Sequence, residues 1–287
     1  MDFKRLLRIA VTLLLVIGII GLVASPAQAD DRYFCVTTGD WNVAGNWDSD
    51  ALCEDGNPSV PTAAHRAIIQ SGQTCNMDKA AGEADTIEVE STAKLNVETG
   101  NVLTLDGSVV ADAGISTING AVKLEGSGSE LAFKDNDQTL DGSGSIVGHN
   151  SAAEISITSG ETLTNEITIH GTLVINGDGT FDNQGTVQAD GGTVLHVNSG
   201  GVDDTAGATW TVAATLASIC GGCLPSVSTL RFNVPLAFGQ ATHFLAGDFT
   251  VTSGSLDVDV AFKTTGRLTH NSGTIDVDSS ASCTFDD

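Results

Sequence analysis

Short runs of alternating apolar and polar residues, separated by glycine-rich turns, fill most of this 287-residue chain. The stretch from Gly171 to Val197, GTLVINGDGTFDNQGTVQADGGTVLHV, shows the pattern clearly, because Leu173 and Ile175 occupy alternate positions ahead of a Gly/Asp turn. A period of two is typical of β-strands, and glycine at each break supplies the turn. One unit of this length cannot bury its own apolar side, so neighbouring units must stack to form a core.

The same alternation recurs from Thr86 to Ile169 and separates inward from outward side chains. The pairs expected to face the core are Ile87/Val89, Leu95/Val97, Leu103/Leu105, Val122/Leu124, Leu131/Phe133, Ile155/Ile157 and Ile167/Ile169. Acidic residues stand between and beside these pairs, where alternation places them on the solvent side. They are Glu88, Glu90, Glu98, Asp106, Glu125, Glu154 and Glu166.

The phrases LTLDG, VKLEG and QTLDG echo one another at spacings of 19 and 16 residues. A repeat of about twenty residues is typical of the coils of a parallel β-helix. The sequence therefore predicts an all-β chain that forms a single-stranded, right-handed parallel β-helix, a solenoid, with an N-terminal cap. After the N-terminal segment, only Asp78 to Asp85 has helix-forming sequence, enough for a turn or two.

Asx-Gly dipeptides keep a second all-β fold open. They stand at Asp106-Gly107, Asn119-Gly120, Asp141-Gly142 and Asn176-Gly177. Such dipeptides are strong signals for antiparallel hairpins, so a β-sandwich or a hairpin fibre is the alternative. The short, uniform and aliphatic strands favour the β-helix.

The first 29 residues have the features of a signal peptide. Lys4, Arg5 and Arg8 precede an apolar run that ends at Val23, and small residues lead to Ala29, after which cleavage is expected. An uncleaved membrane anchor is the alternative. The sequence therefore predicts export, to the cell surface or the medium, with no membrane span after cleavage.

The remaining chain divides into two parts by composition. Residues 30–85 are expected to form the cap with the first coil, and residues 86–287 the β-helix body, with a less regular excursion at about 207–248. Cleavage after Ala29 would remove three of the 12 basic and one of the 36 acidic residues, which leaves a formal net charge of −26. Such a surface repels nucleic acid and anionic lipid, and it tolerates high salt or binds divalent cations. A purely solubilising surface is the alternative.

Trp41 and Trp47, in GDWNVAGNWD, are followed by Pro61-Thr62-Ala63, a short Ile strand and a Gly-x-Thr. This order resembles the opening of bacterial secreted β-helix proteins and is similar to the start of the eight-glycine domain family. The resemblance implies a prokaryotic, exported protein whose first coil is closed by these aromatic residues. It covers about fifty residues of the chain.

The cap also follows from physical reasoning. The end of a solenoid exposes apolar side chains and unpaired strand edges, and both must be covered. Trp41, Trp47 and Pro61 are the residues expected to cover them, because aromatic rings bury large areas. A platform on which sugars stack is the alternative role of the two tryptophans.

Six cysteines in an exported chain favour disulfides. Cys35, Cys53 and Cys75 fall near the start, and Cys220, Cys223 and Cys283 fall in the last third. In an extended solenoid, pairing is expected within each group, which leaves an odd thiol in each. The CGGC motif lacks the helical setting of a redox site, and His243 and His270 lie at no standard zinc spacing.

Calcium is the one cofactor that the sequence leaves open. Asn176, Asp178 and Asp182 place oxygen ligands at alternate positions, as an EF-hand loop does. Phe181 stands where that loop needs glycine, and Val187 where it needs glutamate, so a polar turn is the favoured interpretation.

We expect an exported structural or adhesive protein of the cell surface or extracellular matrix, without catalysis. A carbohydrate-binding module and a polysaccharide lyase or hydrolase on the same fold are the alternatives. Enzymes of this shape use a basic proton acceptor beside calcium or several aspartates near Gly-His-Gly, and Gly148-His149-Asn150 lacks the rest of that pattern. The expected partners are a polysaccharide or a second copy bound end to end.

Overall fold

The computed structural model describes residues 29–54, 56–108, 114–190, 194–197 and 199, together with the strands from Gly201 onward. Side chains are described up to residue 188, and beyond it only for Leu195, Val197 and Ser199. The predicted signal peptide therefore lies outside the described residues, apart from Ala29.

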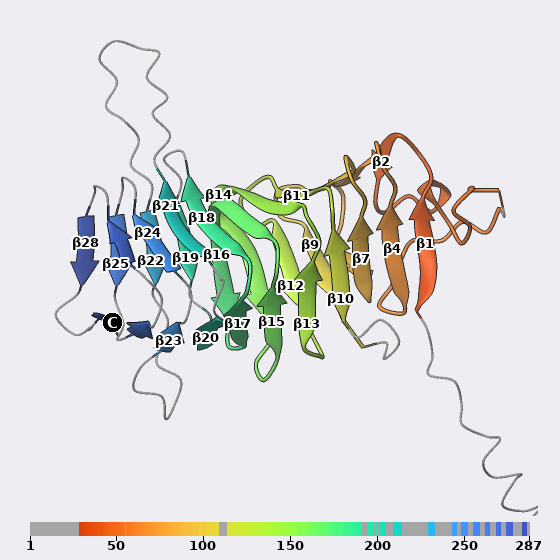
Figure 1. Ribbon diagram of the computed structural model, residues 1–287. Helices are drawn as coiled ribbons and strands as arrows, with labels where there is room; N and C mark the ends of the chain where they lie inside the picture. Colours follow the sequence, from red (N-terminus) through yellow and green to blue (C-terminus); the bar gives the residue numbers. More distant parts are fainter. Residues whose placement is uncertain are drawn as a thin grey trace, which may run out of the picture.

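The described chain is all-β and forms a parallel β-solenoid, as the sequence predicts. Its strands stack side by side along the long axis of the molecule, in rows that form the faces of the solenoid (Figure 1). Each pairing between described strands is parallel except that of β1 with β3. The alternatives of a β-sandwich and a hairpin fibre are therefore wrong, whereas the right-handed sense of the coil stays a prediction.

The strands follow three faces around the solenoid. Face one contains β2 (Thr38–Asp40), β5 (Thr74–Met77), β8 (Lys94–Val97), β11 (Ala121–Leu124), β14 (Ser145–Ile157), β16 (Thr168–Gly177), β18 (Thr186–Asp190), β21 (Thr209–Ala213), β24 (Asp248–Val251) and β27 (Leu268–His270). Face two contains β6 (Gly82–Ala84), β9 (Val102–Leu105), β12 (Glu130–Phe133), the second halves of β14 and β16, β19 (Val194–Val197), β22 (Thr229–Phe232), β25 (Ser255–Val258) and β28 (Thr274–Val277).

Face three begins at the N-terminal end with β3 (Trp47–Asp48) and β1 (Asp30–Phe34). It continues through β4 (His65–Ile69), β7 (Thr86–Val89), β10 (Ile115–Ile118), β13 (Gln138–Asp141), β15 (Thr162–Asn165), β17 (Thr180–Asn183) and β20 (Gly201–Asp204). Beyond β20 lies a parallel sheet of β23 (His243–Leu245), β26 (Phe262–Thr264) and β29 (Cys283–Phe285). A single 3-10 turn, η1 (Ala44–Asn46), interrupts the described strands.

The Asx-Gly dipeptides lie at corners between faces, where the chain turns without forming a hairpin. Gly107, Gly142 and Gly177 adopt φ values of +59°, +121° and +110°, a conformation that glycine enters without strain. A Cβ atom on Gly142 would also lie 2.3 Å from the carbonyl oxygen of Ile118 on the preceding coil. The Asx-Gly dipeptides therefore form turns, as the sequence predicts, and the strand that follows each turn continues around the coil.

The three echoing phrases do not mark successive coils. LTLDG contains the end of β9 on face two, VKLEG the end of β11 on face one, and QTLDG the whole of β13 on face three, each with the turn that follows. The separation of residues that pair between coils varies along the chain, because Thr168 pairs with Thr186 but Leu105 with the more distant Phe133. The echo therefore marks a strand that ends in a turn, which every face uses.

The inward pairs predicted from Ile87 to Ile169 are all buried, with exposures of 3% or less. The acidic residues beside them are half-buried or exposed. Two asparagines join the apolar core, because Asn165 and Asn183 occupy inward positions with no exposed surface. The segment from Asp78 to Asp85 contains β6 (Gly82–Ala84) instead of the expected helical turn, and Gly82 and Ala84 face inward.

The N-terminal end is closed by aromatic residues. Trp41, Trp47 and Phe34 are buried, and the two indoles meet edge to face with ring centroids 4.8 Å apart. Pro61 is buried as well. Gly82 leaves room for the Trp41 ring, because a Cβ atom there would lie 2.6 Å from its Nε1 atom.

The cap is continuous with the solenoid. Its strands β1 and β2 pair in parallel with β4 and β5, so residues 30–85 belong to the same faces as the body. In the predicted excursion at 207–248, β21 pairs with β18 and β22 with β19 in register. Residues 214–228 and 233–242 lie outside the described residues.

Candidate functional site

Outward polar side chains on faces two and three bond from coil to coil. The Arg66 guanidinium lies 3.0 Å from the Asp31 carboxylate on the previous coil and 3.7 Å from that of Glu88 on the next. On face two, Asn176 donates its Nδ2–H to Glu154 at 2.9 Å, and Ser156 donates its hydroxyl to Glu130. Each acceptor and its donor come from neighbouring strands, so these groups hold the stack together.

The calcium candidates are not gathered into a ligand set. Asn176 ends β16 and uses its amide nitrogen on Glu154, whereas Asp182 lies in β17 and accepts a hydrogen bond from Gln184 at 2.8 Å. Asp178 is exposed in the turn between these strands, and Phe181 points into the core. Among the described residues, no group of three His, Cys, Asp or Glu side chains could hold a metal ion.

One carboxyl pair has unusual electrostatics. Burial, a hydrogen bond to Asp135 and the negative charges of Asp135, Glu83 and Asp85 raise the pKa of Asp106 to about 6. Asp106 and Asp135 follow β9 and β12, which pair on face two. Sequence reasoning placed Asp106 only on the solvent side. The signal it missed is that both carboxyls follow strands of the same face.

Face one differs from the other faces in charge. From β5 to Gln188 in β18, the described outward side chains of this face contain no carboxylate, and we call this surface the basic face. It consists of Thr74, Asn76, Lys94, Asn96, Ala121, Lys123, Ser145, Val147, His149, Thr168, His170, Thr172, Thr186 and Gln188.

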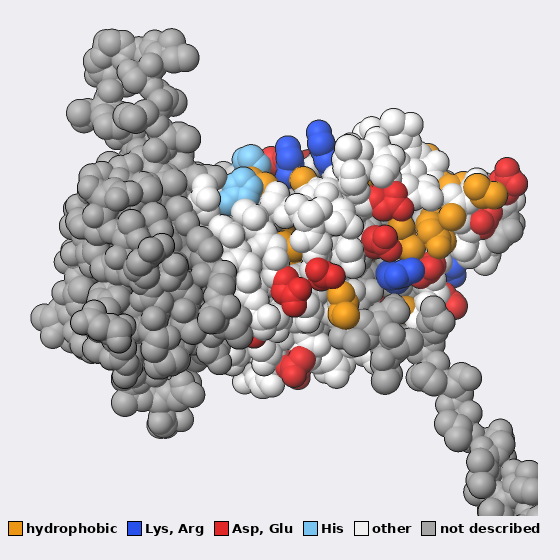
Figure 2. All heavy atoms as spheres, viewed as in Figure 1, with side chains coloured by type: hydrophobic (Ala, Val, Ile, Leu, Met, Phe, Trp, Pro, Cys, Tyr) orange, Lys and Arg blue, Asp and Glu red, His pale blue; other side chains and the backbone are white. Residues whose placement is uncertain are grey.

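The basic face runs along the solenoid without a break. Lys94, Lys123, His149 and His170 come from β8, β11, β14 and β16, which are successive strands. Figure 2 shows basic and histidine side chains gathered along the upper margin of the described part, with most carboxylates on the face below. Sequence reasoning missed this surface, because the carboxylates are interleaved with the lysines along the chain and separate only when the coils close.

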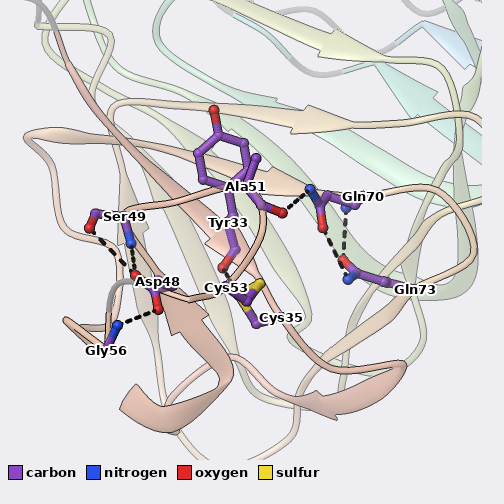
Figure 3. Close-up of a disulfide and its surroundings, with 9 residues drawn as sticks. All are labelled: Tyr33, Cys35, Asp48, Ser49, Ala51, Cys53, Gly56, Gln70 and Gln73. Carbon is purple, nitrogen blue, oxygen red and sulfur yellow. Dashed lines mark hydrogen bonds between the residues drawn. A yellow bond between two sulfur atoms is a disulfide. The ribbon is translucent and has the colours of Figure 1, made fainter.

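The cysteines near the start of the chain pair within their group. Cys35 and Cys53 form a disulfide whose Cα atoms are 5.7 Å apart, in a loop that Asp48 also braces by accepting from the N–H groups of Ser49 and Gly56 (Figure 3). Cys75 is the odd thiol, and it is buried in the core, which raises its pKa well above the ordinary value. Cys220 and Cys223 lie outside the described residues, and Cys283 is described only as backbone in β29.

The two tryptophans of the cap offer no surface for a sugar. Their exposures are 0% and 1%, and the Trp47 indole Nε1–H is donated to the Trp41 carbonyl oxygen at 2.7 Å. The alternative of a stacking platform at Trp41 and Trp47 is therefore wrong. The rings instead pack against Phe34 and each other.

No family model, no curated protein and no solved structure matches this chain. The described part contains no helix that is long and apolar enough to cross a membrane.

Proposed function

We propose that this chain is an exported structural or adhesive protein of the cell surface or extracellular matrix, and that it works as a rigid rod without catalysis. The cap is proposed to resemble that of the eight-glycine domain family. The observation that carries the proposal is the use of outward polar groups for bonding between coils. A rod is stiff along its axis when such ladders add to the backbone hydrogen bonds.

Export is supported by the basic, apolar and small-residue order before Asp30 and by the Cys35–Cys53 disulfide. Disulfides form and persist in oxidising compartments outside the cytoplasm. Expression of the full chain in a bacterial host tests this step, because the exported protein should begin at Asp30 on N-terminal sequencing. A chain that stays in the membrane with residues 1–29 attached would overturn it.

A polysaccharide hydrolase is the second candidate, and the raised pKa of Asp106 is the observation in its favour. Its geometry argues against it. Asp106 and Asp135 share a hydrogen bond, whereas the two carboxyls of a glycosidase stand at least about 5 Å apart to admit the sugar or a water molecule. Below about pH 6, Asp106 therefore keeps a proton that it shares with Asp135.

Incubation with polysaccharides separates the two candidates. The mature protein, residues 30–287, is incubated with a panel of neutral and acidic polysaccharides, and polymer chain length is followed by size-exclusion chromatography. We expect no change in chain length. If the wild-type protein shortens a polymer and Asp106→Asn does not, the protein is a hydrolase and the structural proposal is wrong.

A further inference from the structure

We propose that the basic face binds an acidic polysaccharide, which lies along the solenoid axis across β8, β11, β14 and β16. This inference rests on the adhesive role proposed above and names its partner by chemical class. It begins from the contrast between this face and the rest of a chain whose formal net charge is −24.

The described outward side chains of the basic face differ in charge from the chain as a whole. The chain contains 36 acidic and 12 Lys or Arg residues, yet the described outward positions of the basic face include Lys94 and Lys123 and no acidic residue. The equivalent positions of face two carry Glu83, Glu130 and Glu154. Charge is therefore sorted by face in the folded chain.

The remaining groups of the basic face suit a sugar polymer. Thr74, Ser145, Thr168, Thr172 and Thr186 supply hydroxyls that both donate and accept, and the Gln188 amide does the same. The Asn96 amide donates to the Asn76 side-chain oxygen on the previous coil at 2.8 Å, which leaves the Asn76 amide nitrogen to donate to a polymer. Stacked strands repeat these groups about every 4.8 Å along the axis. A polymer rich in hydroxyls, with carboxylates spaced along it, can meet both kinds of partner at once.

The same arrangement disfavours nucleic acid. A duplex carries one charge per about 1.7 Å of its axis and would meet the repulsion of the whole acidic chain. A polyuronate has fewer charges per unit length, and screening over about 8 Å at physiological salt confines its interaction to the nearest face. A second copy that offers its acidic faces is the remaining competitor, and the experiment below distinguishes it.

Lys123 and its neighbour Glu125 allow two substitutions with opposite expected effects on binding. Its ammonium lies 3.6 Å from the Glu125 carboxylate, which stands at the margin of the basic face just beyond β11. Glu125 competes with the polymer for this lysine. Removing the Glu125 charge is therefore expected to strengthen binding, whereas removing the Lys123 charge weakens it.

The experiment measures binding of the mature protein to polygalacturonate and to its fully methyl-esterified form, which keeps the backbone and lacks the charge. We expect binding to polygalacturonate alone, about tenfold weaker in Lys94→Gln/Lys123→Gln and severalfold stronger in Glu125→Gln. Lys134→Gln is the matched control. Lys134 is as exposed as Lys94 but lies at the corner beyond β12, off the basic face, so its binding should equal that of wild type.

Equal binding of the esterified polymer, or unchanged affinity in Lys94→Gln/Lys123→Gln, would overturn the inference. So would duplex DNA that binds as tightly as polygalacturonate in the same buffer. Sedimentation of the protein alone identifies the second-copy alternative, because self-association abolished by the two lysine substitutions would assign the face to that contact instead. Failure here leaves the rigid rod intact, since the chain-length and export experiments do not depend on it.

Discussion

The Nδ2 atom of Asn165 lies 2.9 Å from the Oδ1 atom of Asn183, one coil further along the solenoid. Both side chains are fully buried, and Asn165 also accepts from the N–H of Ile167 and donates to its carbonyl oxygen. The amide therefore joins two coils and satisfies the backbone of its own corner. Polar groups are retained in this core because a buried corner would otherwise leave backbone groups without partners.

Replacing Asn165 with leucine is expected to destabilise the protein by about 2–4 kcal/mol, because the Ile167 backbone groups and the Asn183 amide lose their partner. Urea denaturation of the mature protein measures the change. Thr164→Leu is the control, since Thr164 is a half-buried outward neighbour and its replacement should cost less than about 0.5 kcal/mol. Equal effects of the two substitutions would contradict the role given to Asn165.

Asp106 makes stability depend on pH. Its pKa of about 6 in the folded protein exceeds the ordinary value of 3.8, so the folded state favours the protonated form. Protonated Asp106 therefore stabilises the folded state. This stabilisation is fully present below about pH 3.8 and is lost as the pH rises through about 6. Asp106→Asn keeps a neutral group there and should raise the melting temperature at pH 8 but change it little at pH 4.

Glu166→Gln is the matched control for this pH dependence, because Glu166 is exposed and its replacement changes the net charge equally. Melting curves of both variants at pH 4, 6 and 8 provide the comparison. The same rise at pH 8 in both variants would show that net charge, and not the Asp135 neighbourhood, is responsible.

Glu130 and Glu154 occupy directly opposed positions on paired strands of face two. Like charges in that position are destabilising by roughly 0.2–1 kcal/mol, and salt screens them. We therefore expect the melting temperature of the mature protein to rise appreciably with salt or with millimolar calcium. Glu130→Gln can still accept a hydrogen bond from Ser156. It should raise the melting temperature at low salt and so reduce the difference in melting temperature between low and high salt. An unchanged melting temperature between low and high salt would count against repulsion along the faces.

Alternation of residues was sufficient to predict the fold, because in a short strand it fixes which side chains enter the core. The inward pairs from Ile87/Val89 to Ile167/Ile169 follow directly from that rule. Alternation could not fix the coil length, since the corners differ in length from coil to coil. Thr168 pairs with Thr186, but Leu105 with the more distant Phe133.

The basic face and the Asp106 pair needed the structure for the same reason. Lys94 and Lys123 are separated in the chain by Glu98 and appear as isolated charges in the sequence. Pairing between coils places Lys94 beside Ala121 and Asn96 beside Lys123, so the two cations come to share one surface. Alternation along the sequence shows whether a side chain faces the core or the solvent. Only the register between coils shows which side chains are its neighbours.

The Cys35–Cys53 disulfide is expected to stabilise the cap by about 2–4 kcal/mol, because it closes a loop with a sequence separation of 18 residues. Cys35→Ser/Cys53→Ser should lower the midpoint of urea denaturation accordingly. Cys75 should resist iodoacetamide in the native protein and react after denaturation, since its thiol is buried. Mass spectrometry of the digested protein checks both states, and native alkylation of Cys75 would contradict its placement.

End-to-end assembly stays a prediction, but its covalent route through the N-terminal cysteine group is wrong. Cys35 and Cys53 bond to each other, and Cys75 is enclosed by the core. At the outermost strand of face one, Asn46 donates its Nδ2–H to the Asp40 carbonyl oxygen at 2.9 Å, so this edge group is already bonded. On face three, the short antiparallel strand β3 covers the edge of β1. Covered edges of this kind oppose strand pairing with another chain.

High salt screens the net charge, so we expect end-to-end association of the mature protein to occur at high salt. Because Cys75 is buried, this association should not require a disulfide through Cys75. Light scattering in high salt should give the same mass for wild type and Cys75→Ser. A truncated chain that begins at His65 lacks β1, β2 and β3, so it exposes the edges of β4 and β5 and should form larger species. A wild-type protein that is monomeric at every salt concentration would contradict the assembly prediction. A lower mass for Cys75→Ser than for wild type would show that Cys75 takes part in the contact and that the core opens to expose it.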